Sequence, residues 1–233
     1  MSTITFSNGD RYEVTYRNGK KEAYGRYIST YGKVYEGYEA SNMAKGRGTC
    51  ICTNGDCYDG TFEYGKMEGH GSYRRADRYT YVGNWIGGKP SGKGNSTWPN
   101  GNCYEGFHQN EKINGYGKFY NLAGDEYTGD LVDGKAHGWG KRKWKNGDYY
   151  DGKFQNDKKH GYGTYTYKSG NKYSGDWSND EMNGEGTFIW TSGSRYIGNF
   201  KNGKRHGYGR LTFINGQVRT GYWENDKYIG EKR

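Results

Sequence analysis

A repeat of 23 residues constrains the fold of this chain more than any other feature of its sequence. A tyrosine followed two places later by a glycine recurs at this interval, in the pairs Tyr35 and Gly37, Tyr58 and Gly60, Tyr81 and Gly83, Tyr104 and Gly106, Tyr127 and Gly129, Tyr150 and Gly152, Tyr173 and Gly175, and Tyr196 and Gly198. Arrays with such a period build each unit against its neighbours. We therefore expect one array over residues 1–233, with first strands near residues 12, 35, 58, 81, 104, 127, 150, 173, 196 and 219.

Each repeat is expected to contain two strands. The segment from Tyr150 to Phe154 alternates large and small residues with a period of two, which indicates a strand with one apolar face. A second alternating stretch follows the paired glycines Gly161 and Gly163. The next turn often carries an Asn-Gly pair, such as Asn54-Gly55, which favours a type I′ hairpin turn because both central residues need positive φ. The pattern predicts an all-β fold, a single-sheet solenoid of about ten antiparallel β-hairpins that forms an elongated rod and stops just after a first strand.

The composition favours a thin aromatic core over a thick aliphatic one. Hydrophobic residues make up only 31% of the chain and the mean hydropathy is −1.24, values that alone are typical of disorder. Aromatic residues reach 18%, however, and there are 42 glycines and only 2 prolines. We expect aromatic columns to stack along one face, with glycines opposite them leaving room for the rings.

The segment from Tyr196 to Gly209 resembles the MORN motif (membrane occupation and recognition nexus), and the resemblance extends over the whole chain. Two repeats depart from the pattern, because Glu39 and His108 stand where an aromatic is expected. An aromatic lies one place earlier in each, which predicts a local bulge or register adjustment. Such arrays occur within lipid kinases, methyltransferases and junctional membrane proteins, and as free-standing cytoskeletal and radial-spoke scaffolds. The resemblance implies the free-standing class, a non-enzymatic structural scaffold within a cytoskeletal or ciliary assembly.

No catalytic, cofactor or metal site is expected. His137, His160 and His206 share one column of the repeat and are interpreted as turn residues. The four cysteines lack the paired CxxC spacing of zinc sites and are expected to be reduced thiols. The Gly-x-Gly segments do not lead into a helix that could hold a phosphate.

The net charge of +9 indicates a preference for anionic partners. The candidate contacts form three groups, namely Arg74, Arg75 and Arg78; Lys141, Arg142, Lys143 and Lys145; and Lys201, Lys204 and Arg205. Protein partners of a cytoskeletal or axonemal kind are expected, and open edge strands would allow a homo-oligomer. The alternative is a peripheral membrane module that binds anionic phospholipids through the basic groups, with weak acidic-lipid contact. Nucleic acid is not an expected partner, because the repeat core already accounts for the aromatics.

The sequence predicts a cytoplasmic protein, located at the cytoskeleton or in a cilium or flagellum. The amino-terminal segment lacks the basic and apolar regions of a secretory signal peptide. The apolar runs are also too short for a transmembrane segment.

Overall fold

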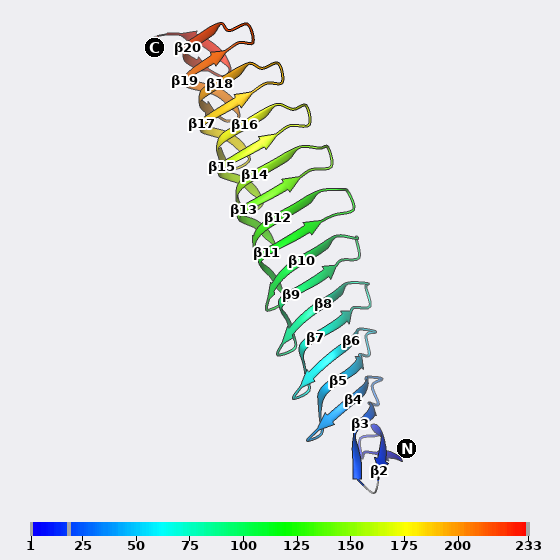
Figure 1. Ribbon diagram of the computed structural model, residues 1–233. Coiled ribbons are helices and arrows are strands. Elements are labelled where there is room, and N and C mark those ends of the chain that lie inside the picture. Colours follow the sequence, from blue (N-terminus) through cyan, green and yellow to red (C-terminus); the bar gives the residue numbers. More distant parts are fainter. Residues whose placement is uncertain (1, 18–19, 232–233) are drawn as a thin grey trace. The chain divides into compact units, whose positions relative to one another are not determined.

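The computed structural model describes residues 2–17 and 20–231, and every element within them is a β-strand. The chain divides into two compact units, residues 1–113 and 114–233, which we describe separately. Within each unit, successive strands lie side by side in chain order (Figure 1). The described residues include no helix that could cross a membrane.

The first unit holds the strands β1 (Ser2–Thr5), β2 (Arg11–Arg17), β3 (Lys20–Ile28), β4 (Val34–Ala40), β5 (Met43–Ile51), β6 (Cys57–Glu63), β7 (Lys66–Arg74), β8 (Thr80–Ile86), β9 (Lys89–Thr97) and β10 (Cys103–Gln109). The second unit holds most of β11 (Lys112–Tyr120), followed by β12 (Glu126–Val132), β13 (Lys135–Lys143), β14 (Tyr149–Gln155), β15 (Lys158–Thr166), β16 (Lys172–Ser178), β17 (Glu181–Ile189), β18 (Arg195–Lys201), β19 (Lys204–Thr212), β20 (Val218–Glu224) and β21 (Lys227–Gly230). The predicted all-β chain of antiparallel hairpins is confirmed. One further strand, β21, follows the point at which the sequence predicts the last strand.

Strand register gives each unit one face that collects the repeat tyrosines. In the second unit, Tyr165 of β15 pairs with Tyr150 of β14 on one side and with Tyr173 of β16 on the other. Directly paired residues project to the same face of a sheet, so the three rings share it. We call this the tyrosine face of the unit, and the other side the opposite face. A bulge between Gly152 and Phe154 brings Phe154 onto the tyrosine face as well.

The core of each repeat is a set of rings in edge-to-face contact. Tyr150 is fully buried, and its ring centroid lies 5.1 Å from Phe154 and 5.4 Å from Trp177 of the next repeat. Its hydroxyl donates a hydrogen bond to the backbone oxygen of Lys153 at 3.0 Å, which satisfies the buried polar atom. Perpendicular ring pairs of this kind contribute beyond their buried area. The rings therefore link each repeat to the next.

Glycine is required opposite these rings. A Cβ atom at Gly163 would collide with the hydroxyl and ring of Tyr150, although the backbone of Gly163 is not left-handed. The same collision with the repeat tyrosine of the preceding strand occurs at Gly71, Gly94 and Gly209. The periodic glycine therefore provides the space into which each tyrosine ring packs.

The sequence predicts tight type I′ turns at the Asn-Gly pairs, but the structure has wider loops there. At Asn54-Gly55 only Gly55 has positive φ (+86°), and its N–H donates to the oxygen of Cys52 at 3.0 Å. This is a wider loop with one left-handed glycine, so the prediction of type I′ geometry there is wrong. Asparagine is favoured because its side-chain oxygen accepts the N–H of Asp56 at 3.1 Å.

The tight two-residue turns instead join each first strand to the following second strand. Asn156 and Asp157, between β14 and β15, both have positive φ (49° and 69°). This is the backbone that a type I′ turn requires. In the second unit, β13, β15 and β17 run toward the wider loops on the right of Figure 1, and the tight turns lie at the other side.

Two other sequence expectations are corrected by the register. The bulge between Gly37 and Glu39 is the one that the regular repeats also have, so Glu39 keeps its column and Tyr38 is exposed without any special adjustment. His137, His160 and His206 lie inside β13, β15 and β19, not in turns. Each histidine directly precedes the repeat glycine of its strand, which is Gly138, Gly161 or Gly207.

Arg78 occupies the left-handed position of a wider loop, where other repeats have glycine, and its φ is +76°. A side chain in this conformation costs about 1–2 kcal/mol, against about 0.5–1 kcal/mol of extra unfolded-state entropy for glycine. We expect Arg78→Gly to stabilise the first unit by roughly 0.5–1 kcal/mol, measured by urea unfolding. Gly55→Arg, at the matching position one repeat earlier, should destabilise it. Equal effects of the two changes would contradict the assignment.

Candidate functional site

On the tyrosine face, tyrosine hydroxyls bond to loop carboxylates in three repeats. Tyr73 donates to Asp56 at 2.5 Å and Tyr165 donates to Asp148 at 2.7 Å, while Tyr27 donates to Asp10. The second oxygen of the same carboxylate accepts a backbone N–H from the next wide loop, as Asp56 does from Ala76 at 3.0 Å. Each of these carboxylates therefore connects its own wide loop both to a strand tyrosine and to the next wide loop along the chain.

The pKa of the Asp56 carboxyl is held below its usual value by the hydrogen bond from the Tyr73 hydroxyl and then by the N–H of Ala76. Because the folded pKa lies below the unfolded value of about 3.9, this contribution is present above about pH 4 and is lost as the pH falls through the folded pKa. We expect the urea midpoint of the wild-type chain to drop between pH 5 and pH 3. Asp56→Asn, which keeps an oxygen acceptor but no charge, should drop less over that interval, and an identical drop would contradict this role.

The Tyr79 repeat reverses this arrangement. Here the loop position holds Tyr79 and the strand position, filled by Tyr73 one repeat earlier, holds Ser96. The Tyr79 hydroxyl lies 3.1 Å from the Ser96 hydroxyl, which in turn lies 3.0 Å from Nε2 of His108. Ser96 is 1% exposed and His108 is 4% exposed, whereas Tyr79 is half-buried, so this chain of three polar groups leads from the loop to two buried side chains.

His108 also stands in a ring column, where Trp85 stands one repeat earlier. Its imidazole makes edge-to-face contacts with Tyr81 at 4.9 Å and with Tyr104 at 5.2 Å. Burial lowers the pKa of the imidazole, which favours the neutral form. His108 therefore acts as a neutral ring within the core and adds a nitrogen that reaches Ser96.

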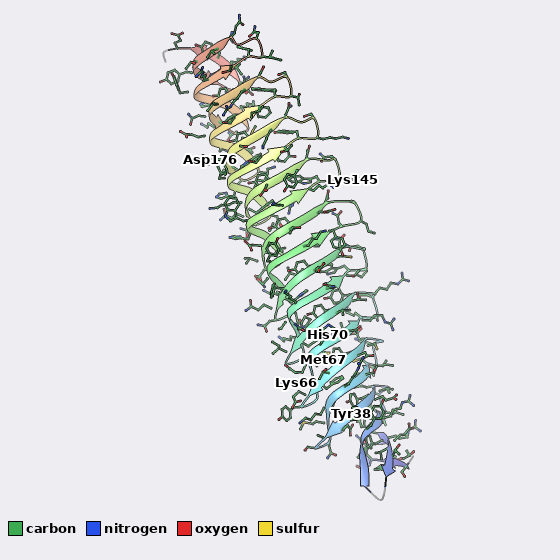
Figure 2. The ribbon with its side chains drawn as sticks, in the orientation of Figure 1. Tyr38, Lys66, Met67, His70, Lys145 and Asp176 are labelled. Carbon is green, nitrogen blue, oxygen red and sulfur yellow. The ribbon has the colours of Figure 1, made fainter. Side chains whose placement is uncertain are left out.

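A cavity of about 440 Å³ lies on the tyrosine face of the first unit, and Ser96 is at its buried end. Its lining consists of Met67, Tyr73, Arg75, Tyr79, Trp85, Gly88, Pro90, Ser96, Trp98, His108, Glu111 and Ile113. Figure 2 labels Met67, which belongs to β7. The volume falls within the range of about 300–1,000 Å³ typical of ligand sites, and the lining combines apolar rings with a few convergent polar groups.

The tyrosine face of the second unit carries a continuous row of half-buried rings. Trp144 lies 5.4 Å from Tyr165, Tyr165 lies 4.6 Å from Tyr167, and the row continues through Phe188 to Trp190. These rings pack against the core on one side and retain exposed surface on the other. We call Trp144, Tyr165, Tyr167, Phe188 and Trp190 the ring row.

Three cations lie among these rings. Lys159 Nζ lies 4.7 Å from the Trp177 ring and 4.8 Å from the Tyr165 ring, and 3.8 Å from an Asp180 carboxylate oxygen. Burial lowers the pKa of Lys159. Two further cations, Arg142 with Asp157 and Arg205 with Asp226, repeat this combination of ring contact and ion pair. Cation–ring contacts of this kind are favourable where water is excluded.

The ten basic residues predicted as contacts for anionic partners do not share one environment in the structure. Arg142 and Arg205 turn onto the tyrosine face, Arg75 pairs with Asp77 at 2.5 Å, and Lys141 pairs with Asp151 at 3.4 Å. The others are exposed and make no ion pair with the described residues, namely Arg74, Arg78, Lys143, Lys145, Lys201 and Lys204. Figure 2 labels Lys145, which lies beyond the end of β13. Neighbours in sequence are thus divided between the two faces.

The sequence analysis did not predict the cavity near Ser96 or the position of Lys159 among aromatic rings. The signal was present, because both residues break columns that hold aromatic or aliphatic side chains in other repeats. Among the residues that the structure describes, no group of three or more histidine, cysteine or acidic side chains is placed to hold a metal ion. The candidate site is therefore the tyrosine face, with the cavity in the first unit and the ring row in the second.

Comparison with known proteins identifies the repeat. A family profile described as the MORN repeat matches residues 12–30, 35–57, 58–78, 81–103, 127–149, 150–172, 173–195 and 196–218. The repeat that contains His108 lies between the matched ranges. No curated protein matches the chain in sequence.

Several solved structures share a similar arrangement at low similarity. A point mutant of the TCP10 domain of Danio rerio CPAP has 12% identity and a TM-score of 0.44, covering 96% of this chain and 100% of its own. The G-box domain of the microcephaly protein CPAP has 11% identity and a TM-score of 0.35, with coverages of 96% and 99%. Virginiamycin B lyase from Staphylococcus aureus has 8% identity and a TM-score of 0.19, with coverages of 95% and 83%. With TM-scores this low, these likenesses do not bear on function.

Proposed function

We propose, because the chain belongs to the MORN repeat family, that it is a non-enzymatic scaffold that holds partner proteins against the tyrosine faces of its units. MORN repeats are modules for protein and membrane interaction. We place the scaffold in a cytoskeletal or ciliary assembly, with residues 1–233 acting as one repeat array.

The ring row of the second unit is the observation that carries this proposal. Aromatic and arginine side chains are enriched where protein interfaces form, because they offer large rigid areas at low entropic cost. The ring row offers five such rings in sequence, with Arg142 and Arg205 beside it. Since the cations already pair with aspartates of the chain, the surface is apolar with neutralised charges. Such a surface suits a protein partner better than a phosphate.

Lipid binding is the second candidate, and the six exposed unpaired cations support it. Four of the ten basic residues are held in ion pairs with aspartates of the chain, however, which reduces the charge available to a membrane. Exposed charges spread along a surface are also screened at physiological salt. We therefore expect only weak, salt-sensitive adsorption to anionic vesicles. Edge strands would allow a second copy to pair, which remains part of the scaffold proposal.

The test is capture of partners by the tagged chain from its native cells, followed by mass spectrometry. The scaffold proposal expects a fixed set of cytoskeletal or axonemal proteins that persists in high salt. Flotation with anionic vesicles serves as the lipid arm of the same experiment. Salt-resistant vesicle binding without a protein set would reverse the order of the two candidates.

A further inference from the structure

We propose that the tyrosine face of the second unit binds a proline-rich segment of a partner protein, in the polyproline II conformation and with acidic residues among its prolines. This inference rests on the proposed function, because it names what a partner presents to the ring row. The proposed contacts are four rings that each directly follow the second strand of a repeat, namely Trp144, Tyr167, Trp190 and Phe213. We call these four residues the loop rings.

The spacing of the loop rings matches the pitch of a polyproline II helix. They recur once in each repeat, and a repeat advances by two strands, or about 9.4–9.8 Å. A polyproline II helix has three residues per turn and shows the same side again after about 9.3 Å. Every third residue of such a segment can therefore meet one loop ring, in four successive repeats.

Other regular conformations of a bound segment fit this spacing less well. An α-helix shows the same side after seven residues, or about 10.5 Å, so it falls out of step by about 2–3 Å over the four rings. A β-strand shows the same side after two residues, or about 6.6–6.8 Å, and its third residue points to the other side. The pitch therefore selects the polyproline II conformation, which proline favours.

The spaces between the loop rings suit prolines. All four rings are half-buried, so part of each ring is open to a ligand. Trp190 and Phe213 line a cavity of about 280 Å³, together with Ser192, Ser194, Arg205 and the buried Leu211. An apolar cavity of about 150 Å³ is large enough for benzene, so this one admits the ring of a proline. Grooves lined with aromatic rings are a general means of binding polyproline II segments.

The loop rings also supply hydrogen-bond donors that the chain itself does not use. Among the described residues, the indole N–H groups of Trp144 and Trp190 and the hydroxyl of Tyr167 have no hydrogen-bond partner, and none of these atoms is fully buried. By contrast, the indole N–H groups of Trp177 and Trp223 donate to backbone oxygens at 3.1 and 3.2 Å. A proline-rich segment has free carbonyl oxygens and few N–H groups, so it needs donors of this kind.

The charges beside the loop rings select acidic residues in the partner. The three cations among the rings are paired with aspartates of the chain, so the surface over the rings is nearly neutral. Lys145 and Lys168, which directly follow Trp144 and Tyr167, are exposed and make no ion pair with the described residues. The prolines therefore lie over the rings, and carboxylates beside them meet the two lysines on the loop side.

The fold itself does not require the loop rings. In the first unit the same position holds Ser29, Cys52, Arg75 and Trp98, so only one of the four is a ring. The core tyrosines of that unit, such as Tyr58, are nevertheless buried. Since the sheet forms without a ring at this position, its presence in four successive repeats supports a role in binding.

The test is a titration of the purified full chain with a peptide of four Pro-Pro-Glu triplets, followed by the NMR signals of the tryptophan indole N–H groups. We expect saturable shifts of the Trp144 and Trp190 signals and none of the Trp85 signal in the first unit. A peptide of four Gly-Ser-Glu triplets has the same charge but is not preorganised, so it should bind roughly tenfold more weakly. Equal binding of both peptides, or absence of saturable shifts, would overturn the proposal.

A second peptide tests the pitch. One glycine inserted between the second and third Pro-Pro-Glu triplets turns the two halves by about 120° relative to each other. Only one half then keeps step with the loop rings, so we expect the affinity to fall roughly tenfold. Unchanged affinity would overturn the proposal. Stronger shifts of the same signals by an acidic amphipathic helical peptide would also overturn it and assign the surface to a helix.

Replacing both Lys145 and Lys168 with glutamate tests the charge preference without touching the core, because both side chains are exposed. We expect the affinity for the Pro-Pro-Glu peptide to fall roughly threefold to tenfold and that for a Pro-Pro-Lys peptide to rise. Lys201→Glu with Lys204→Glu makes the same change of charge at the other end of the strands, and as the matched control it should leave both affinities unchanged. Equal effects of the two double variants would overturn the assignment.

The peptide titration and the capture of partners can fail separately. Captured proteins without binding of the Pro-Pro-Glu peptide would overturn this inference and leave the proposed function standing. Anionic vesicles that shift the Trp144 and Trp190 signals where the peptide does not would overturn it in favour of lipid. Failure to capture any protein would overturn the proposed function, while the titration decides the peptide site independently.

Discussion

Replacing Gly163 with valine is expected to destabilise the second unit by about 3 kcal/mol or more. The backbone of Gly163 is not left-handed, so the cost comes from overlap alone. Its Cβ would enter the space of the Tyr150 ring, which is buried and held by neighbouring rings on both sides. Urea unfolding followed by tryptophan fluorescence measures the effect.

Gly203→Ala is the matched control for glycine replacement. Gly203 has a φ of +78°, and a Cβ there would meet no atom within 4 Å. Only the backbone conformation is then strained, at about 1–2 kcal/mol. If Gly163→Val cost no more than Gly203→Ala, the glycine column would not be the space that receives the rings.

Replacing Tyr150 with alanine is expected to cost about 3–5 kcal/mol, the range for deleting a large buried ring. The ring joins two repeats, since it contacts Phe154 of its own repeat and Trp177 of the next. Tyr150→Phe keeps the ring and removes only the hydroxyl that bonds to Lys153, so it should cost roughly 1 kcal/mol. The same urea titration compares the two.

Tyr162→Ala provides the control for ring deletion on the opposite face. Tyr162 lies in β15 and is 55% exposed, so its loss should stay within about 0.5 kcal/mol. A cost similar to that of Tyr150→Ala would mean that both faces support the fold equally. The distinction between the tyrosine face and the opposite face would then fail.

The sequence predicted the repeat, the strands and the ring columns because these depend on period alone. It failed on turn type because an Asn-Gly pair suits two different turns. Asn54 and Gly55 serve a wider loop in which the asparagine side chain caps Asp56, whereas the type I′ turns use pairs such as Asn156 and Asp157. Which geometry forms depends on how many residues separate the last paired positions of two strands, and local composition does not fix that number.

The basic groups were harder to place because adjacent residues in a strand project to opposite faces. Lys141 and Arg142 are neighbours in sequence, yet Lys141 pairs with Asp151 and Arg142 lies over the Phe154 ring. The aspartate that pairs with Arg142 comes from the next tight turn, at Asp157. Alternation was visible in the sequence, but the partner in the turn required the register.

The cavity at Ser96 could have been found from the columns, though its chemistry could not. Ser96 stands in a column that holds larger side chains in other repeats, and His108 stands in a column of aromatic rings. That the hydroxyls of Tyr79 and Ser96 meet at 3.1 Å depends on a loop residue reaching over the sheet. Such a contact between a loop and a strand follows from three-dimensional packing and not from periodicity.

The most direct measurement of the central claim compares partner capture by two double variants. One changes Tyr167 and Trp190 of the ring row to serine, and the other changes Tyr162 and Tyr208, exposed on the opposite face, to serine. Both are first shown to be folded by thermal unfolding. We expect the ring-row variant to lose the captured proteins and the opposite-face variant to retain them. Retention by the ring-row variant together with loss by the other would contradict the account and assign binding to the opposite face.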